Sequence, residues 1–307
     1  MPELLLAPVA LVVLGALALA SATGDRVLLA RASGRPLALS TVSPLPEVAR
    51  LLVQRRRTTP APDALLWRVG GGGLLVVAAL MMAVVPLGGR VVADLPVGVV
   101  WFNAMDVLLW ALVWLLGWGA ASATALVAGY RYLAQALAYE LPLMFALIPP
   151  ALAAASLDVR AVVAAQQDRG NVVEMPIAFA VFLLCVAAFA FWGPLSAPAG
   201  GDVAGGVLAE VSGVDRLLVL AGRHALLAAG AAFAVPLFLG GDAGPLLPGW
   251  LWQLGKTLAV LAVLLVIRRR LPVLRPERFA ELGWLVLIPL TLVQVFLTSL
   301  LVLGSAS

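Results

Sequence analysis

Residues 284–304 read WLVLIPLTLVQVFLTSLLVLG, a run that contains no Asp, Glu, Lys, Arg or His. A helix needs about 20 mainly apolar residues to cross a bilayer, and this run is long enough. Comparable runs precede it along the whole chain. The expected spans are residues 4–23, 65–87, 97–119, 124–154, 172–195, 215–240, 249–268 and 284–304. The sequence therefore predicts an all-α polytopic membrane protein with about eight transmembrane helices.

The composition of the chain leads to the same fold class. Of the 307 residues, 63% are hydrophobic and 12% are charged, and the mean hydropathy is +1.06. A soluble domain carries about 25% charged residues, so this chain has too few to cover a water-facing surface. We expect one membrane domain over residues 1–307.

The first span has an alternative interpretation as a signal peptide cleaved near residues 20–22 (Ala-Ser-Ala). Signal peptides begin with positive charge. This chain carries Glu3 and no Lys or Arg before Arg26. The charge pattern favours a transmembrane helix.

The residues that most often bind metals are scarce, with Cys185 as the single cysteine and His224 as the single histidine. A disulfide framework, an iron–sulfur cluster and a site with several histidines are therefore excluded on this chain. The pI near 10.0 comes from arginine, because Lys256 is the sole lysine. In a membrane protein such an excess reports on topology. We expect no metal site and no nucleic-acid partner.

An amphipathic helix is predicted over residues 42–57, after the first span. In SPLPEVARLLVQRRR (43–57), apolar residues recur at helical spacing, whereas Glu47, Arg50 and Gln54 lie on other faces. Such a helix lies along the membrane surface. The alternative is a solvated basic loop.

The distribution of arginine predicts the orientation in the membrane. Seven arginines lie in the 24–63 connection: Arg26, Arg31, Arg35, Arg50, Arg55, Arg56 and Arg57. Five more lie between residues 268 and 283, whereas the alternate connections hold only Arg90, Arg160 and Arg169. Cytoplasmic loops carry the excess of positive charge. We expect a multi-pass protein of the cell membrane with arginine-rich loops inside, both termini outside, and an inner loop at 196–214.

Ionisable residues inside spans are candidates for function because they are costly there. Asp106, Glu140 and Lys256 are the candidates for a proton path, with a structural polar contact as the alternative for the acids and snorkelling for the lysine. His224 fits packing near the interface better than a catalytic role. Arg131, Gln135 and Tyr139 share one helix face, and Glu140 points about half a turn away from Arg131.

Several ordered segments resemble one known family. They are DRVLLAR (25–31), SPLPEVARLL (43–52), YRYLAQALAYELPL (130–143), AEVSG (209–213), LGKTL (254–258) and LPVLRPERFAELGW (271–284). In order and spacing they are similar to segments of the H subunit (mitochondrial subunit 1) of the proton-pumping NADH–quinone oxidoreductase, respiratory complex I. Energy-converting hydrogenases have related membrane subunits.

The resemblance implies a role shared with other subunits. Quinone would be the substrate, iron–sulfur clusters, flavin and NADH would belong to partner subunits, and lipid would surround the chain. No complete active site is expected on this chain. A proton path would use Glu140, Lys256 and Asp106. The quinone site and the inner surface would use Arg26, Arg31, Glu47, Arg50, Arg131, Gln135, Asp202, Glu210 and Glu277.

The chain departs from the family pattern at FAFWGPLSAPAGGDVAGGVLAEVSG (189–213). The family has a run rich in acids there, whereas this chain has Phe189, Trp192, Ser196 and Ala199. The family's acid in the sixth span is replaced by Gly222. These losses support an alternative function, the membrane anchor of a hydrogenase-like or truncated complex with a degenerate quinone site.

A transporter or channel unrelated to redox chemistry would require only the polytopic pattern. That interpretation leaves the ordered motifs unexplained.

Overall fold

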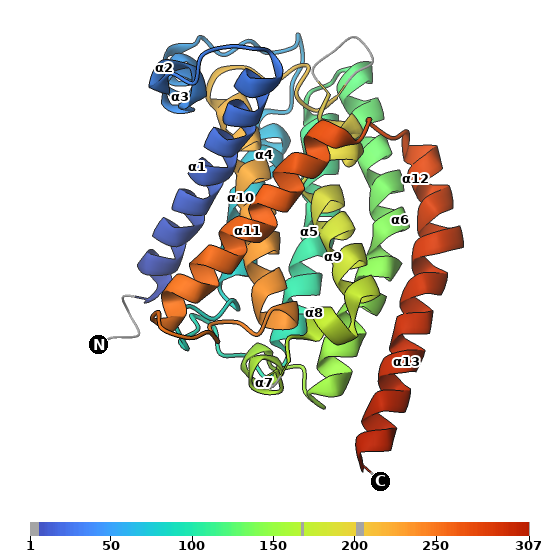
Figure 1. The fold of residues 1–307 in the computed structure, drawn as a ribbon. Helices are drawn as coiled ribbons and strands as arrows, with labels where there is room; N and C mark the ends of the chain where they lie inside the picture. Colours follow the sequence, from blue (N-terminus) through green and yellow to red (C-terminus); the bar gives the residue numbers. More distant parts are fainter. Residues whose placement is uncertain (1–5, 167–168, 201–205, 307) are drawn as a thin grey trace.

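The computed structural model describes residues 6–166, 169–200 and 206–306. Within these residues, eight helical segments are long and apolar enough to cross a membrane (Figure 1). They are α1 (Leu6–Ala32), α4 (Ala64–Met82), α5 (Gly98–Gly119), α6 (Ala123–Ala153), α9 with η2 (Pro176–Phe189, Gly193–Leu195), α10 (Gly213–Phe238), α11 (Gly249–Arg270) and the continuous α12, η4 and α13 (Pro276–Leu282, Gly283–Leu287, Ile288–Ala306). The predicted all-α polytopic fold is confirmed.

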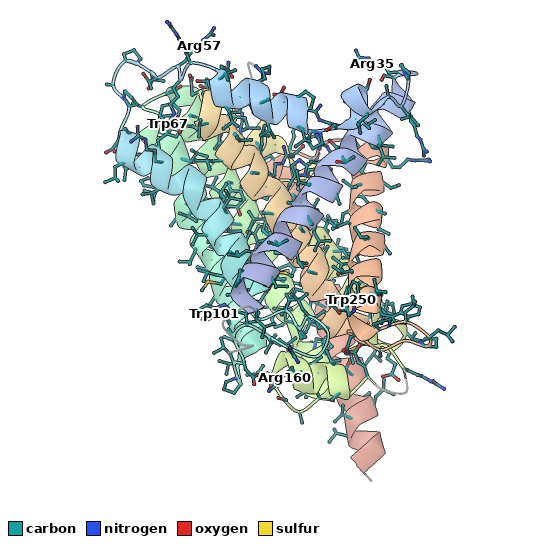
Figure 2. The ribbon with its side chains drawn as sticks, turned by 90° about the vertical axis from the view of Figure 1, so that its left-hand side faces the viewer. Arg35, Arg57, Trp67, Trp101, Arg160 and Trp250 are labelled. Carbon is teal, nitrogen blue, oxygen red and sulfur yellow. The ribbon has the colours of Figure 1, made fainter. Side chains whose placement is uncertain are left out.

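The two ends of the bundle differ in what they carry. The short helices α2 (Leu39–Val42) and α3 (Leu45–Val53) lie at one end, which we call the arginine end (Figure 1). The outer ends of α1 and α13 lie at the opposite end, near α7 (Val159–Ala164) and α8 (Asn171–Glu174). Arg35 and Arg57 lie at the arginine end, and Arg160 and Trp250 lie toward the other (Figure 2). The arginine-rich connections thus share one side.

The fifth span differs from its expected bounds of 172–195. Its first part is a separate helix, α8, because Pro176 lacks an N–H and disfavours helical geometry at the preceding Met175 (φ −128°, ψ 50°). At the other end α9 stops at Phe189, where Phe191 and Gly193 adopt positive φ (49° and 59°). The chain then continues as the short η2 and η3 (Ala197–Ala199).

Helix α10 lies at the centre and packs against α1, α3, α4, α9 and α11. Its contact with α4 is very close, since a Cβ added at Gly222 would lie 2.6 Å from Cβ of Leu74. Aromatic rings fill the space toward α5 and α9, with Phe102 and Phe233 stacked at a centroid distance of 3.9 Å. The position at which the family carries an acid has no room for a side chain.

The amphipathic helix appears as α3 and is attached to the start of α10. The backbone N–H of Arg57 donates to Ser212 Oγ (2.6 Å), and that of Gly213 donates to Gln54 Oε1 (3.3 Å). Arg56 lies 3.7 Å from the carboxylate of Asp215. These contacts hold α3 against the arginine end of the bundle.

Candidate functional site

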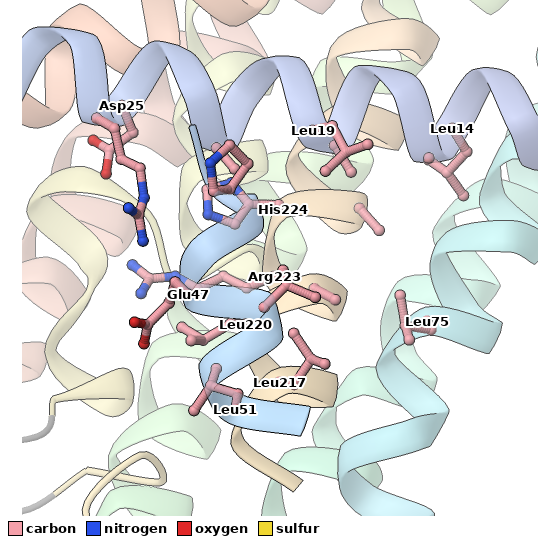
Figure 3. Close-up of a pocket in the computed structure, with 18 of the residues that line it drawn as sticks. Leu14, Leu19, Asp25, Glu47, Leu51, Leu75, Leu217, Leu220, Arg223 and His224 are labelled. Carbon is pink, nitrogen blue, oxygen red and sulfur yellow. The ribbon is translucent and has the colours of Figure 1, made fainter. Parts of the chain in front are cut away.

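An elongated cavity of about 580 Å³ lies between α1, α3, α4 and α10. Its walls are aliphatic, and the lining side chains include Leu11, Leu14, Leu19, Leu75, Leu217 and Leu220. Figure 3 shows the aliphatic side chains Leu14 and Leu75 on one side and charged side chains on the other. We call it the polar-ended cavity.

Charged side chains gather at the polar end of this cavity, where Asp25, Arg26, Glu47 and Arg268 line it. Asp25 accepts hydrogen bonds from Arg268 Nη1 (2.8 Å) and Arg269 Nη2 (2.7 Å). Arg26 donates to the carbonyl of Ser43 (3.2 Å), so α1 is joined to the segment before α3. The structure thus brings together the predicted residues Arg26 and Glu47.

Glu47 has its own cationic partner on α3. Its carboxylate accepts hydrogen bonds from Nε (2.9 Å) and Nη2 (2.6 Å) of Arg50. This hydrogen bond and the charge of Arg50 hold the pKa of Glu47 below its usual value. Glu47 is therefore an ionised, paired group at the mouth of the cavity.

Trp192 closes the polar end from the inside. Its indole Nε1 donates to the Leu264 carbonyl (3.1 Å), and its ring is contacted by two guanidinium groups. Arg223 lies 5.2 Å and Arg268 lies 4.4 Å from the ring centroid, within cation–π distance. Arg223 Nη2 also donates to the carbonyl of Phe191. The charge-poor stretch at 189–195 is thereby held by two arginines.

His224 also lines the cavity, next to Arg223. Its Nδ1 is 2.8 Å from Ser21 Oγ, and that hydroxyl donates its proton to the Ala18 carbonyl (2.8 Å). Because Ser21 has only one hydroxyl proton, Nδ1 of His224 is the donor in their contact. His224 packs edge-on against Trp192, with ring centroids 5.2 Å apart.

Asp106 on α5 and Glu140 on α6 form a second candidate site, the carboxyl pair, and they interact with each other. Asp106 is fully buried and accepts a hydrogen bond from the Tyr139 hydroxyl (3.2 Å). Tyr132 extends this chain, with its hydroxyl 3.1 Å from that of Tyr139. Asn103 Nδ2 donates to Glu140 Oε1 (3.0 Å).

One oxygen of each carboxyl group in the pair has no partner. Asp106 Oδ2 and Glu140 Oε2 are buried and accept no hydrogen bond from the residues that the structure describes. A proton shared between the two groups would supply the missing donor, because a protonated carboxyl donates one hydrogen bond. Asn103 also lines a separate apolar cavity of about 630 Å³ between α5 and α6.

Three predicted residues have structural contacts elsewhere. Gln135 donates its amide to the carbonyls of Ala188 (2.8 Å) and Leu195 (3.1 Å) and so holds the irregular end of the fifth span. Glu210 accepts hydrogen bonds from Ser122 (2.7 Å) and Thr124 (3.1 Å) at the start of α6. Lys256 donates to the carbonyls of Leu239 (2.7 Å), Gly241 (3.0 Å) and Ala243 (2.8 Å).

The other predicted residues do not line the polar-ended cavity. Arg31, Arg50 and Glu277 are exposed, and Arg131 is half-buried on α6. Asp202 lies outside the described residues. The structure thus joins only part of the predicted quinone set, and it places the carboxyl pair on other helices.

Sequence reasoning missed several residues at the two sites. Asp25, Arg223 and Arg268 line the cavity, and Ser21 orients His224 across a large sequence separation. The adjacent ionisable residues Arg223 and His224 in one apolar span were a signal for the cavity. Asn103, three residues before Asp106 and thus on the same face of α5, was a signal for the carboxyl pair.

The described residues contain no group of three or more His, Cys, Asp or Glu side chains that could hold a metal ion. With its eight candidate spans, the chain is an all-α polytopic membrane protein, and its most developed site is a lateral cavity with a polar end.

Comparison with known proteins places this chain in a family. The family model described as NADH dehydrogenase matches residues 5–299. One NADH-quinone oxidoreductase H subunit of Geobacter sulfurreducens, the second of that name, is 33% identical over 268 residues, which cover 84% of this chain and 82% of that protein. The corresponding H subunit of Syntrophotalea carbinolica is 30% identical over 269 residues, with 84% and 82% covered. The chain belongs to the NADH dehydrogenase family, as the sequence motifs indicated.

Proposed function

We propose that this chain is the membrane-embedded H subunit of a complex-I-like, proton-translocating NADH–quinone oxidoreductase, in which it forms part of the quinone site and of a proton path. The observation that carries the proposal is the polar-ended cavity between α1, α3, α4 and α10. The family membership supports the general role of a membrane subunit in an oxidoreductase complex.

The cavity has the chemistry that a membrane quinone requires. Its aliphatic walls suit an isoprenoid tail, and its polar end offers N–H groups for the oxygens of a head group. The redox groups that deliver electrons, namely iron–sulfur clusters, flavin and NADH, would belong to partner subunits. This chain would bind and orient the quinone and exclude water from it.

The carboxyl pair is the best candidate for proton transfer on this chain. Two carboxyl groups in contact favour sharing one proton over carrying two charges. The hydroxyl groups of Tyr139 and Tyr132 continue the polar chain from Asp106 toward the Phe189 carbonyl. Lys256 remains a predicted member of the path, although its three carbonyl contacts support a structural role instead.

The orientation that we propose follows from the arginine end. Because positively charged loops remain in the cytoplasm, this end would face inward and both termini would face outward. The mouth of the cavity beside α3 would then be near the cytoplasmic surface, where a peripheral redox subunit could dock.

A second candidate function is the membrane anchor of an energy-converting hydrogenase-like or truncated complex. The close contact between Gly222 and Leu74 favours it, because an acid cannot be accommodated at that position. The buried Phe189 and Trp192 favour it as well, because they replace charged residues of the family run. In this case the cavity would hold lipid.

Filling the cavity tests the proposal. Gly15 lines the cavity on α1, and a Cβ added there has no atom within 4 Å, so a large side chain can enter the space. We expect Gly15→Trp to abolish quinone reduction by the purified complex without preventing assembly. Gly255→Trp is the matched control, because Gly255 is exposed on α11 and also has no atom within 4 Å.

The two candidate functions give different results in this experiment. Quinone reductase activity lost in Gly15→Trp and kept in Gly255→Trp supports the quinone site. Full activity in Gly15→Trp contradicts it. A wild-type complex that copurifies with nickel–iron hydrogenase subunits and has no quinone reductase activity supports the membrane anchor.

A further inference from the structure

Arg223 has a donor that the protein leaves unused. Its side chain is only 7% exposed, yet it lines the polar-ended cavity. Nη2 is bound to the Phe191 carbonyl, but the Nε–H is buried and meets no acceptor among the described residues. A buried donor without a partner costs about 1–3 kcal/mol, so such a group indicates a missing ligand.

The neighbouring His224 offers the complementary group. Its Nδ1 is occupied by Ser21, so Nε2 is the ring nitrogen that remains to accept a hydrogen bond in the neutral imidazole. Figure 3 shows His224 and Arg223 on the same helix, between the charged side and the aliphatic side of the cavity. A donor and an acceptor are thus adjacent on α10.

The charges around Arg223 leave it as the group best able to bind an oxygen ligand. The charge of Arg268 is offset by Asp25, and Glu47 is paired with Arg50. Among the described residues, no carboxylate forms a salt bridge with Arg223. Its positive charge therefore favours an electron-rich oxygen at the polar end.

We propose that Arg223 and His224 hold the oxygen atoms of the quinone head group, with Arg223 Nε–H donating to a carbonyl oxygen and His224 Nε2 accepting the hydroxyl of the reduced form. This inference rests on the proposed function and deepens it. It assigns head-group recognition to two residues that stand beside Gly222, where the family's acid is missing, so this chain would use its own recognition pair.

The competing role for Arg223 is purely structural, since it also holds the Phe191 carbonyl and stacks on Trp192. Arg223→Lys separates the two roles. A lysine keeps the charge and has an N–H group that can reach for the carbonyl, but it has no Nε–H at the position that faces the ligand. Arg216→Lys is the matched control, because Arg216 lies on α10, donates to the Leu208 carbonyl and does not line the cavity.

The experiment measures the dissociation constants of a short-chain quinone and of its quinol for the purified complex, together with the thermal midpoint. Loss of a charged hydrogen bond costs about 1.5–3 kcal/mol, so Arg223→Lys should weaken quinone binding roughly 10-fold or more. His224→Ala should weaken quinol binding more than quinone binding. Arg216→Lys should leave both constants unchanged.

The outcomes separate this inference from the proposed function. Unchanged quinone binding in Arg223→Lys and His224→Ala, with tight binding to the wild type, overturns the recognition pair and leaves the quinone site in place. A lowered thermal midpoint with unchanged binding assigns Arg223 to the structural role. Absence of quinone binding to the active wild-type complex overturns the proposed function itself.

Discussion

Asp106 and Glu140 show how a single residue type can be predicted while its partner cannot. Each was identified because a carboxyl group within an apolar helix is costly and usually functional. Their contact depends on how α5 and α6 pack, and the spacing within either helix could not reveal it. In the same way, the contact between Ser21 and His224 joins residues 203 positions apart.

At the residue scale, we expect Glu140→Gln to abolish coupled proton translocation while quinone reduction continues. A glutamine keeps the acceptor for Asn103 but cannot take up and release a proton. Proton movement into proteoliposomes, measured with a pH-sensitive dye, checks this. Glu281→Gln is the control, because Glu281 is exposed on α12 and paired with Arg278. Unchanged pumping in Glu140→Gln would remove Glu140 from the path.

At the scale of elements, the existence of the eight spans followed from the length of the apolar runs, and the resemblance to the family was confirmed. The breaks in the fifth span did not follow from this. Pro176 and the Gly193–Pro194 pair carried the signal, but the average hydropathy of the run concealed it. The close packing of α4 against α10 depends on Gly222 meeting Leu74 across the bundle, which no local pattern reveals.

Lys256 belongs to this scale because it joins α11 to the end of α10. We expect Lys256→Met to lower the thermal midpoint by several degrees, since three carbonyls would lose a charged donor worth about 1.5–3 kcal/mol. Lys256→Arg should recover part of the loss. Arg270→Met, at the exposed far end of α11, is the control.

The same variants decide whether Lys256 also serves the proton path. A normal thermal midpoint together with lost proton translocation in Lys256→Met would support the relay and contradict the structural role. Differential scanning fluorimetry and the dye assay give the two readings from one preparation.

At the scale of the whole molecule, the polar-ended cavity is assembled from segments that are far apart in the sequence. α1, α3, α4 and α10 each contribute lining residues, and α11 adds Arg268. The motifs predicted Arg26 and Glu47 at this site, but they also grouped Glu210 and Gln135 with them, which bind other parts of the fold. Shared family motifs therefore identified the site but could not delimit it.

Labelling with a photoreactive quinone analogue is the most direct test of the central claim, that the polar-ended cavity holds the quinone. The purified, active complex is irradiated with the analogue, and the labelled peptides are identified by mass spectrometry. We predict labels on α1 and α10 at residues that line the cavity, competed away by excess quinone. Labels confined to other surfaces of this chain, or only to partner subunits, would contradict the account.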